Sequence, residues 1–558
     1  MAESAHVELV ATGGVRVAVE GCGHGTLNAI YDSIKTACAK RGWDGVDLLI
    51  IGGDFQAVRN AADLNAMSVP AKYREIGDFH EYYSGKRTAP YLTLFIAGNH
   101  EASSHLWELF YGGWAAPNIY YMGAANVLRL GPIRIAGLSG IWKGRDYNKT
   151  HFERLPFNQD DVKSFYHVRE IDVRRLLLMR SQVDVGLSHD WPRGIEWSGN
   201  SAQLFRQKPF FEQESKDGTL GSAAATYVLD RLRPPYWFSA HLHCKFAALK
   251  KHQPAMEAPA DQETSNVSAG VQEKAALVAP VSNTDEIDLD MDEDDDVVPA
   301  PAASSAAQET GAQSAVTEDM RAQLPESFSA PKPTGPKKIP GQPVPASIPN
   351  TETRFLALDK CLPGRHYLQI NEIIPFDKSS LETYPPAANG TAGSRFKLQY
   401  DPEWLAINRV LAGSIEIGNP KAVNAPDLGE DVYIPMIEAE KAWVQENIVD
   451  KGLLDVPENF EVTAPVHQEG DPEVVEDLPV EYTNPQTVKF CELLGISNQW
   501  DAPENERAAR QQAGPRESEF VDRRHGRDNR GGYGGRGGRG GRGGRGGRGG
   551  RGGGRGRF

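Results

Sequence analysis

Cysteine is scarce in this chain of 558 residues. Its 5 cysteines are odd in number and form no Cys-x-x-Cys pair, which argues against a disulfide framework and favours a reducing compartment. No apolar run approaches the roughly 20 residues that a membrane span requires. Residues 1–14, which we expect to be a flexible N-terminus, also lack the basic start and apolar core of a signal peptide. We therefore expect a soluble protein inside the cell with no membrane partner.

The charges of the chain are unevenly distributed. The formal net charge is −15, but an acidic block at 283–296 (NTDEIDLDMDEDDD) contrasts with an Arg/Gly tract at 523–558. A net value hides such asymmetry. The sum of the charges therefore neither supports nor excludes a nucleic-acid partner.

Two segments have compositions that do not support a folded core. Residues 251–350 are rich in Ala, Pro, Ser, Gln and Glu without apolar periodicity, so they cannot bury enough surface to offset the entropy of ordering. Residues 501–558 lead into repeated Arg-Gly-Gly units, which lack side chains for a core. We predict that both segments are disordered and that the folded regions span 15–250 and 351–500.

The region 15–250 has the alternating pattern of an α/β protein, in which short apolar runs alternate with helical patterns. After the first apolar run, the apolar residues from Leu27 to Cys38 share one helical face, and Gly42 marks a C-terminal stop. In the second region, 395–411 predicts a strand followed by an amphipathic helix. Buried strands are predicted in the first region at 15–21, 48–53, 91–98, 133–138, 183–188 and 236–240.

Polar residues capable of chemistry directly follow most of these strands. Ligands at the carboxyl ends of neighbouring strands converge on one crevice of an open α/β sheet, and glycines beside them allow sharp turns. One such motif alone would usually be an ordinary turn. Together they predict a metal site built from GCGHG (21–25), GGD (52–54), GNHE (98–101), SHDWP (188–192) and AHLH (240–243).

This succession of motifs resembles the calcineurin-like metallophosphoesterase superfamily. That superfamily normally reads Asp-x-His in the first motif, whereas Cys22 stands at the first ligand position here. The lariat debranching enzymes share that substitution. Two further stretches are similar to this family: SGIWKGRDYNKTHFE (139–153) resembles its recognition loop, which extends to about Arg169, and TRFLALDKCLPGR (353–365) resembles the start of its C-terminal domain.

The resemblance implies a fold and a ligand set. The fold would be a metallophosphoesterase-type β-sandwich flanked by helices at 15–250, with the recognition loop at about 139–169 and a smaller C-terminal domain at 351–500. Two adjoining metal pockets would share one carboxylate. The first pocket would consist of Asp54, Asn99, His189 and His241, and the second of Cys22, His24, Asp54 and His243.

The ligand types narrow the choice of metal. Carboxylate, amide and imidazole ligands suit divalent iron, zinc or manganese. Cys22 leaves two alternatives open, because a thiolate ligand would favour zinc or iron, whereas an unligated cysteine would merely narrow the pocket. Mechanisms with one ion and with two ions therefore both remain.

The activity implied by the resemblance is hydrolysis of the 2′,5′-phosphodiester at the branch point of excised intron lariats, which allows intron turnover during mRNA processing. The metal would activate the attacking water and neutralise the phosphodiester oxygens. His100 matches the family's catalytic histidine and, as an imidazolium, could protonate the departing 2′-oxygen, an effect of about 10²–10⁴-fold. The alternatives are a supporting hydrogen-bonding role for His100 and an orienting role for His24.

The implied recognition loop mixes aromatic and basic side chains. Aromatic faces stack on splayed bases and cations meet phosphates, which suits branched RNA. Without the resemblance, packing of these aromatics on the domain surface would be favoured. The implied substrate-binding residues are Trp142, Lys143, Arg145, Tyr147, Asn148, Lys149, His151 and Phe152.

The RGG tail carries charge without a fixed shape and could bind single-stranded RNA through phosphate contacts and arginine stacking. The family also implies residence in the nucleus, without excluding the cytoplasm. The alternatives to debranching are a general metallophosphatase on the same scaffold and a non-catalytic RGG-type RNA-binding scaffold. Cys22 and the loop at 139–169 argue against the first, and the intact ligand set argues against the second. Protein partners are not indicated.

Overall fold

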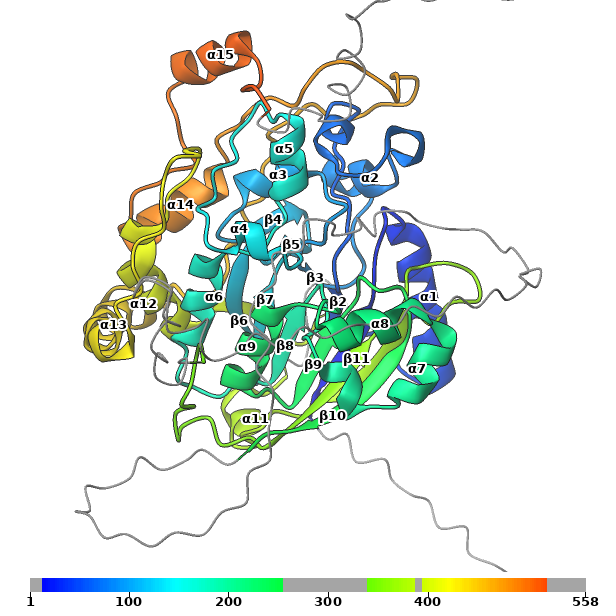
Figure 1. Ribbon diagram of the computed structural model, residues 1–558, viewed down its shortest axis with the longest axis vertical. Helices are drawn as coiled ribbons and strands as arrows, with labels where there is room; N and C mark the ends of the chain where they lie inside the picture. Colours follow the sequence, from blue (N-terminus) through cyan, green and yellow to red (C-terminus); the bar gives the residue numbers. More distant parts are fainter. Residues whose placement is uncertain (1–12, 254–338, 387–393, 519–558) are drawn as a thin grey trace, which may run out of the picture. The chain divides into compact units, whose positions relative to one another are not determined.

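The computed structural model describes residues 13–253, 339–386 and 394–518 (Figure 1). Most of the N-terminal segment, most of the 251–350 insertion and the Arg/Gly repeats lie outside these residues. What the sequence predicts for those segments stays a prediction.

Two mixed β-sheets form the centre of the described structure. The six-stranded sheet has the order β12-β1-β2-β3-β5-β4, and the seven-stranded sheet has the order β10-β11-β9-β8-β7-β6-β13. Strands β1, β2, β3 and β5 run parallel, as do β7, β8, β9 and β11. The strands are β1 (Val15–Glu20), β2 (Leu48–Ile51), β3 (Thr93–Phe95), β4 (Gly113–Ala116), β5 (Ile119–Tyr121), β6 (Ala125–Leu130), β7 (Ile133–Leu138), β8 (Val185–Ser188), β9 (Tyr236–Ser239), β10 (Phe246–Lys251), β11 (Glu352–Ala357), β12 (Leu368–Ile373) and β13 (Leu398–Tyr400).

The alternation of side chains along the strands gives the six-stranded sheet two buried faces. Val17 and Val19 of β1 belong to the same core cluster as Ile135 and Leu187 of the other sheet. Ala18 points to the opposite face and packs in a second cluster with residues of α1. Because successive side chains of a strand point to opposite faces, the first cluster fills the space between two stacked sheets. The predicted β-sandwich flanked by helices is confirmed.

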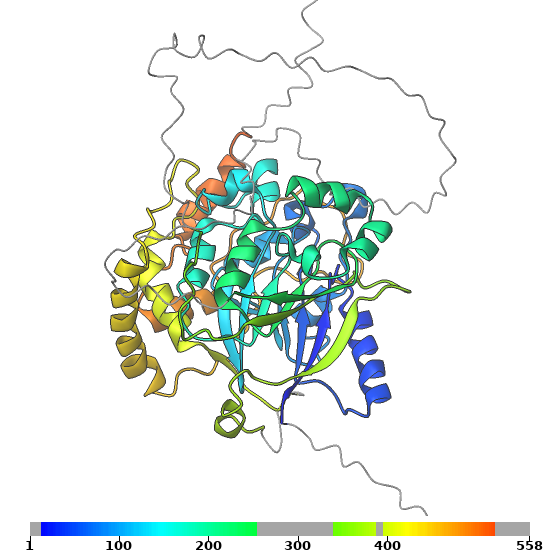
Figure 2. The same cartoon turned by 60° about the horizontal axis from the view of Figure 1, so that its bottom comes forward.

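Helices cover the outer faces of both sheets. Helix α1 covers the six-stranded sheet, α6 and α9 pack against the seven-stranded sheet, and α12 and α13 lie side by side (Figures 1 and 2). The helices are α1 (Leu27–Arg41), α2 (Phe79–Tyr83), α3 (Ser103–Glu108), α4 (Gly144–Tyr147), α5 (Gln159–Ser164), α6 (Glu170–Leu177), α7 (Ser201–Gln207), α8 (Phe210–Asp217), α9 (Ala223–Leu232), α11 (Ser380–Thr383), α12 (Pro402–Leu411), α13 (Glu430–Val444), α14 (Pro485–Leu494) and α15 (Glu504–Ala513).

The helix expected after the first strand ends as predicted. Gly42 caps α1 in the left-handed conformation, with φ of 71°, and its N–H reaches the carbonyls of Cys38 and Ala39. Leu27 and Cys38 are both buried. The strand and helix expected at 395–411 are also present, as β13 and α12.

The C-terminal region contributes strands to both sheets. Strand β11 lies between β9 and β10, β12 pairs with β1, and β13 pairs with β6. The start of the predicted C-terminal domain is therefore part of the sandwich, and the segment between β11 and β12 forms backbone hydrogen bonds with Gly21 and Cys22 of the first metal-binding motif.

The described structure differs from the expected disorder within both segments, 251–350 and 501–558. Helix α15 forms within 501–558, because its Ala, Arg, Glu and Gln residues favour a helix and Glu504 and Glu506 suit the first turn. Residues 339–350 also have described positions, where Arg231 donates hydrogen bonds to the carbonyls of Gly341 and Pro343.

None of the helices in the described ranges combines the length and the apolar composition that a membrane crossing requires.

Candidate metal centre and active site

The predicted ligands lie directly after parallel strands. Cys22 follows β1, Asp54 follows β2, Asn99 follows β3, His189 follows β8 and His241 follows β9. The strands of both sheets therefore deliver side chains to one place at their carboxyl ends. This is the position in which open α/β sheets bind their ligands.

The backbone at this place is strained. His24, Asp54, His241 and His243 all have positive φ, at 41°, 45°, 63° and 45°. A non-glycine residue in this conformation costs about 1–3 kcal/mol, and such residues persist where the surrounding structure holds them for a function. These backbone conformations direct four predicted ligands toward one another shortly after their strands end.

Two glycines make room for the ligands. A Cβ atom on Gly53, which has a φ of 123°, would lie 2.1 Å from Nδ1 of His189. A Cβ atom on Gly98 would lie 2.1 Å from Oδ1 of Asp54. Neither position tolerates a side chain, which accounts for the glycines in the GGD and GNHE motifs.

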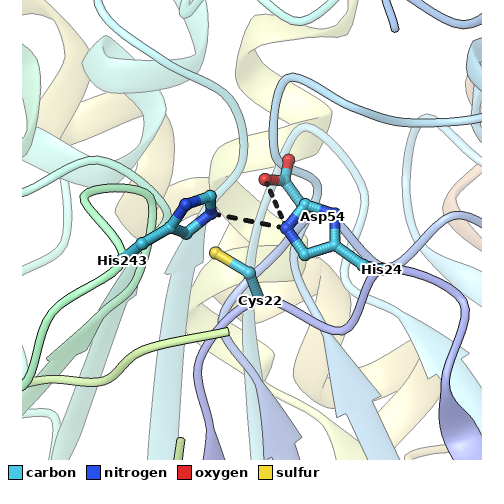
Figure 3. Close-up of side chains that lie close together, drawn as sticks. All are labelled: Cys22, His24, Asp54 and His243. Carbon is cyan, nitrogen blue, oxygen red and sulfur yellow. Dashed lines mark hydrogen bonds and ion pairs between the residues drawn. The ribbon is translucent and has the colours of Figure 1, made fainter. Parts of the chain in front are cut away.

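Cys22, His24, Asp54 and His243 form one pocket, hereafter the cysteine pocket (Figure 3). One potential ligand atom from each side chain lies within 4.8 Å of each of the others. The Nε2 atoms of His24 and His243 are 3.4 Å apart, and Nε2 of His24 is 3.8 Å from Oδ2 of Asp54. In the described part of the chain, this is the only group of three or more His, Cys, Asp or Glu side chains whose potential ligand atoms lie so close together.

The other predicted ligands lie next to this pocket, and the set Asp54, Asn99, His189 and His241 is hereafter called the asparagine pocket. Nε2 of His189 lies 3.4 Å from Oδ1 of Asp54 and 3.3 Å from Oδ1 of Asn99. The ring centroids of His189 and His241 are 5.0 Å apart. Nδ1 of His189 is 2.8 Å from the carbonyl oxygen of Gly52, which orients Nε2 toward the pocket. The Asp54 carboxylate therefore lies between the two pockets.

The protonation states of these groups suit a metal ion. Burial alone would raise the pKa of Asp54, but His189, His100 and His24 hold it well below its usual range, so the carboxylate is ionised. Burial lowers the pKa of His241 to about 4 and that of His243 to about 2. Both imidazoles are therefore neutral near pH 7, which is the form that binds metals.

Unlike Asp54, His241 and His243, the Cys22 side chain is not in its metal-binding protonation state. Burial, followed by the charges of Asp54 and Glu20, raises the pKa of the Cys22 thiol well above its ordinary value. Without a cation the thiol would stay protonated. A divalent ion in the cysteine pocket would oppose this shift, so binding through Cys22 would release a proton.

The donor set fits one or two divalent ions. The asparagine pocket offers carboxylate, amide and imidazole donors, and the cysteine pocket offers a thiol, a carboxylate and two imidazoles. Imidazole suits zinc and iron, and oxygen donors also suit manganese. The buried, ionised Asp54 supplies a charge that both pockets share.

His100 lies beside both pockets. Its backbone N–H donates to Oδ1 of Asp54 at 2.9 Å, and its Nδ1 is 3.8 Å from Oδ2 of the same carboxylate. It also borders an open cavity together with His24. His100 therefore lies between the shared Asp54 carboxylate and this cavity.

Two residues without a predicted role support the site. The Gln56 Nε2 lies 3.2 Å from Nδ1 of His24 and orients that ring. Glu101 accepts hydrogen bonds from the backbone N–H groups of Phe55, Gln56 and Gly98, at 2.8, 2.8 and 2.9 Å. It thereby fixes the GGD and GNHE turns against each other. The only sequence signal was the place of Glu101 at the end of GNHE.

The predicted recognition loop begins beside the metal centre. The backbone N–H of Trp142 points to a carboxylate oxygen of Asp190 at 3.4 Å, and Asp190 follows the ligand His189. Trp142 packs against Tyr147, with ring centroids 4.9 Å apart. Arg145, Asn148 and Lys149 are exposed, whereas Lys143 is half-buried.

His151 and Phe152, in the middle of the loop, pack against neighbouring side chains. Nε2 of His151 pairs with Asp172 at 2.7 Å, and its ring packs edge-on against Phe110. Phe152 lies against the guanidinium of Arg169. These contacts give both side chains a structural role, whether or not they touch RNA.

The C-terminal region positions both the loop and the first metal-binding motif. The side chain of Asn424 donates to the carbonyls of Asn148 and Lys149 in the loop. The backbone N–H of Cys361 donates to the carbonyl of Cys22 at 3.3 Å. The site therefore depends on segments several hundred residues away.

Comparison with known families agrees with this geometry. Residues 15–245 match the family described as calcineurin-like phosphoesterase, and residues 350–499 match the C-terminal domain of lariat debranching enzyme. The catalytic region is thus a metal-dependent phosphoesterase of the calcineurin-like class.

Relatives across eukaryotes extend the match over most of the chain. The lariat debranching enzyme of Schizosaccharomyces pombe is 39% identical over 487 residues, which is 86% of this chain and 96% of the relative. The human enzyme is 40% identical over 484 residues, 86% of this chain and 69% of its own. The Arabidopsis thaliana enzyme is 36% identical over 482 residues, 86% of each chain. The chain belongs to the lariat debranching enzyme family.

Proposed function

We propose that this protein hydrolyses the 2′,5′-phosphodiester at the branch point of lariat RNA, leaving a 2′-hydroxyl on the branch nucleotide and a 5′-phosphate on the released strand. The observation that carries the proposal is the pair of adjoining pockets around Asp54, in a chain whose catalytic and C-terminal regions both match the family. The released strands would be substrates for further intron turnover.

The residues of the metal centre have different roles in this proposal. Asn99, His189 and His241 would hold an ion with Asp54 in the asparagine pocket, and Cys22, His24 and His243 would hold one with Asp54 in the cysteine pocket. When bound, a divalent metal supplies charge stabilisation to the phosphodiester and activates the attacking water. Glu101 and Gln56 keep the ligand loops in place.

His100 is the proton donor in this proposal. The nearby Asp54 carboxylate favours the imidazolium, and the side chain borders the cavity in which a phosphodiester can lie. The imidazolium gives its proton to the 2′-oxygen as the bond to phosphorus breaks. The leaving group therefore departs as a hydroxyl rather than as an alkoxide.

The native metal is iron, zinc or manganese in our proposal. The thiol and imidazoles of the cysteine pocket favour zinc or iron there, whereas the carboxylate and amide oxygens of the asparagine pocket also accept manganese. Metal content of the purified protein, measured by mass spectrometry, tests this assignment independently of activity.

Substrate binding involves the loop and the tail. The exposed Arg145 and Lys149 supply cations beside the Trp142 and Tyr147 rings, a combination that suits unstacked bases and phosphates. The Arg/Gly tract at 523–558 adds non-specific affinity for single strands. Deletion after Val521 should weaken RNA binding and lower its salt dependence. We also propose a nuclear location, where lariats arise, which fluorescent tagging would test.

The test of the proposed function is cleavage of a synthetic branched RNA with one 2′,5′ linkage, mixed with a linear 3′,5′ RNA of the same composition. The protein is first stripped by chelation and then supplied with iron, zinc or manganese in turn. We expect cleavage of the branch alone, only after metal is restored. Hydrolysis of phosphomonoesters or phosphoproteins without branch cleavage would indicate a general phosphatase instead.

A further inference from the structure

An open cavity borders the metal centre on the side of His24 and His100. Its opposite wall is formed by the segment 69–78, which contributes Val69, Tyr73 and Glu75. None of these residues belongs to a motif of the metal site or to the recognition loop. Because His24 and His100 line the cavity, whatever occupies it lies next to the proposed proton donor.

Tyr73 is the aromatic side chain of this wall. It lies in a short 3₁₀ turn, Ala71–Tyr73, and 49% of its surface is exposed. The ammonium of Lys72 lies over the ring at 4.4 Å from the centroid. The ring therefore has a cation on one face and does not contribute to the protein core. An exposed aromatic ring beside a catalytic centre can bind an unstacked base.

The segment 69–78 is held against the first metal-binding motif by backbone contacts. Gly25 and Gly77 both have positive φ, at 69° and 63°, and a Cβ on Gly77 would lie 2.9 Å from the carbonyl oxygen of Gly25. The same carbonyl accepts a hydrogen bond from the backbone N–H of Asp78 at 3.1 Å. The close contact of these backbones fixes the wall relative to His24.

The wall does not suit a phosphate. The carboxylate of Asp78 accepts the backbone N–H groups of Leu27 and Asn28 at 2.9 and 2.7 Å, so it occupies the N-terminus of α1 where an anion could otherwise bind. Glu75 adds a second carboxylate to the cavity. An aromatic ring beside acidic groups accommodates a neutral, hydrogen-bonding ring better than an anion.

We propose that Tyr73 is the stacking platform for a nucleobase adjoining the 2′,5′ linkage, so that the cavity between Tyr73 and His100 is a base subsite of the debranching reaction. The inference rests on the proposed function, which supplies the RNA. The base stacks on the ring, its phosphate reaches the metal centre, and the scissile bond is placed near His100. Tyr73 is thus a residue that determines substrate binding, not the chemistry.

The test combines substitutions in the protein with single abasic sites in the RNA. Tyr73→Ala and Tyr73→Phe are compared with Phe210→Ala, which removes an aromatic side chain that is 79% exposed on α8. The substrates are a branched RNA and a set in which each nucleotide next to the branch is made abasic in turn. Cleavage gives KM and kcat, and RNA binding is measured in the His100→Ala background by fluorescence anisotropy.

We expect Tyr73→Ala to raise KM and Kd for the complete branched RNA by about tenfold, the usual scale for loss of base stacking, with kcat within about threefold. One abasic RNA should impose the same penalty on the wild type, and on that RNA Tyr73→Ala should add nothing further. Tyr73→Phe should stay within about twofold of wild type, because it keeps the stacking face. Phe210→Ala should also match wild type.

Three results would overturn the inference: an unchanged KM for Tyr73→Ala, an equal Tyr73→Ala penalty on every abasic RNA, or no rescue by Tyr73→Phe. Thermal melting of each variant shows whether it is folded. If the wild type itself does not cleave branched RNA, the proposed function fails and the inference with it. Cleavage by the wild type together with any of the three results removes the inference alone.

Discussion

The backbone N–H of His241 donates a hydrogen bond to the Sγ of Cys22, with an N···S distance of 3.3 Å. This bond joins the first metal-binding motif to the last, across 219 residues of sequence. It also places the sulfur beside Asp54, His24 and His243 (Figure 3). A thiol, a carboxylate and two imidazoles therefore have potential ligand atoms within 4.8 Å of one another, which is the arrangement that the thiolate alternative for Cys22 requires.

The first prediction concerns metal preference. Cys22→Asp replaces a soft thiolate donor by a hard carboxylate and should shift the preference from zinc or iron toward manganese, by roughly tenfold in the bound ratio. The measurement is metal content by mass spectrometry after reconstitution with equal zinc and manganese. Cys38→Ala, which alters a buried cysteine of α1 outside the cluster, is the control. An unchanged zinc-to-manganese ratio would show that Cys22 is not a ligand.

The second prediction concerns His100. His100→Ala should lower kcat for branched RNA by about 10²–10⁴-fold, because the departing 2′-oxygen loses its proton donor. Metal content should stay that of the wild type, since His100 is not in either ligand set. His80→Ala, in helix α2, serves as the matched histidine control. A loss of less than about tenfold, or a loss of metal in proportion to activity, would contradict the assigned role.

The third prediction distinguishes an exposed residue of the recognition loop, Arg145, from a packed one, His151. The Arg145 side chain is 57% exposed, so Arg145→Ala should weaken RNA binding, lower the salt slope by about one, and leave the melting temperature unchanged. The His151 side chain is 12% exposed and pairs with Asp172. His151→Ala should therefore reduce the free energy of unfolding by about 1–3 kcal/mol. Anisotropy in a salt series and urea unfolding distinguish these effects, and the reverse pattern would refute the division.

The fourth prediction concerns acid stability. Burial, with a further contribution from Arg59, lowers the pKa of His105 to about 3, whereas histidine in an unfolded chain titrates near 6.5. Between pH 7 and 5 the unfolded chain binds a proton that the folded chain does not, so this histidine lowers stability by about 2 kcal/mol as the pH falls. Urea unfolding at pH 7 and 5 should show a correspondingly smaller difference for His105→Gln. An identical pH dependence would contradict the buried, neutral state.

The features of the site that could be predicted from the sequence depend on residues that are close together along the chain. Each ligand directly follows an apolar strand, as Asp54 follows β2, and glycines such as Gly53 and Gly98 leave the room that the ligands need. A strand-turn pattern of this kind is readable from neighbouring residues. The arrangement of seven ligands in two pockets around Asp54 came from the family resemblance, and the distances are consistent with it.

The parts that the sequence did not predict depend on contacts between distant residues. Strand β12 pairs with β1, with Val15 opposite Ile373, and Arg134 forms a two-point contact with Asp401, which caps α12. Such pairings are decided by tertiary packing, not by local propensity. The supporting roles of Gln56 and Glu101 could not be predicted for the same reason. Their hydrogen-bond partners are brought close only by the folded arrangement of the loops.

The most direct test of the account is the change Asp54→Asn, because this one carboxylate lies between both pockets. The amide keeps the shape but removes the charge that the ions share. We predict that Asp54→Asn loses bound metal and cleaves a single 2′,5′ branch at least about 10³-fold more slowly than wild type, while Asp32→Asn, at an exposed position of α1, changes neither. Cleavage of the branch by Asp54→Asn at the wild-type rate would contradict the account.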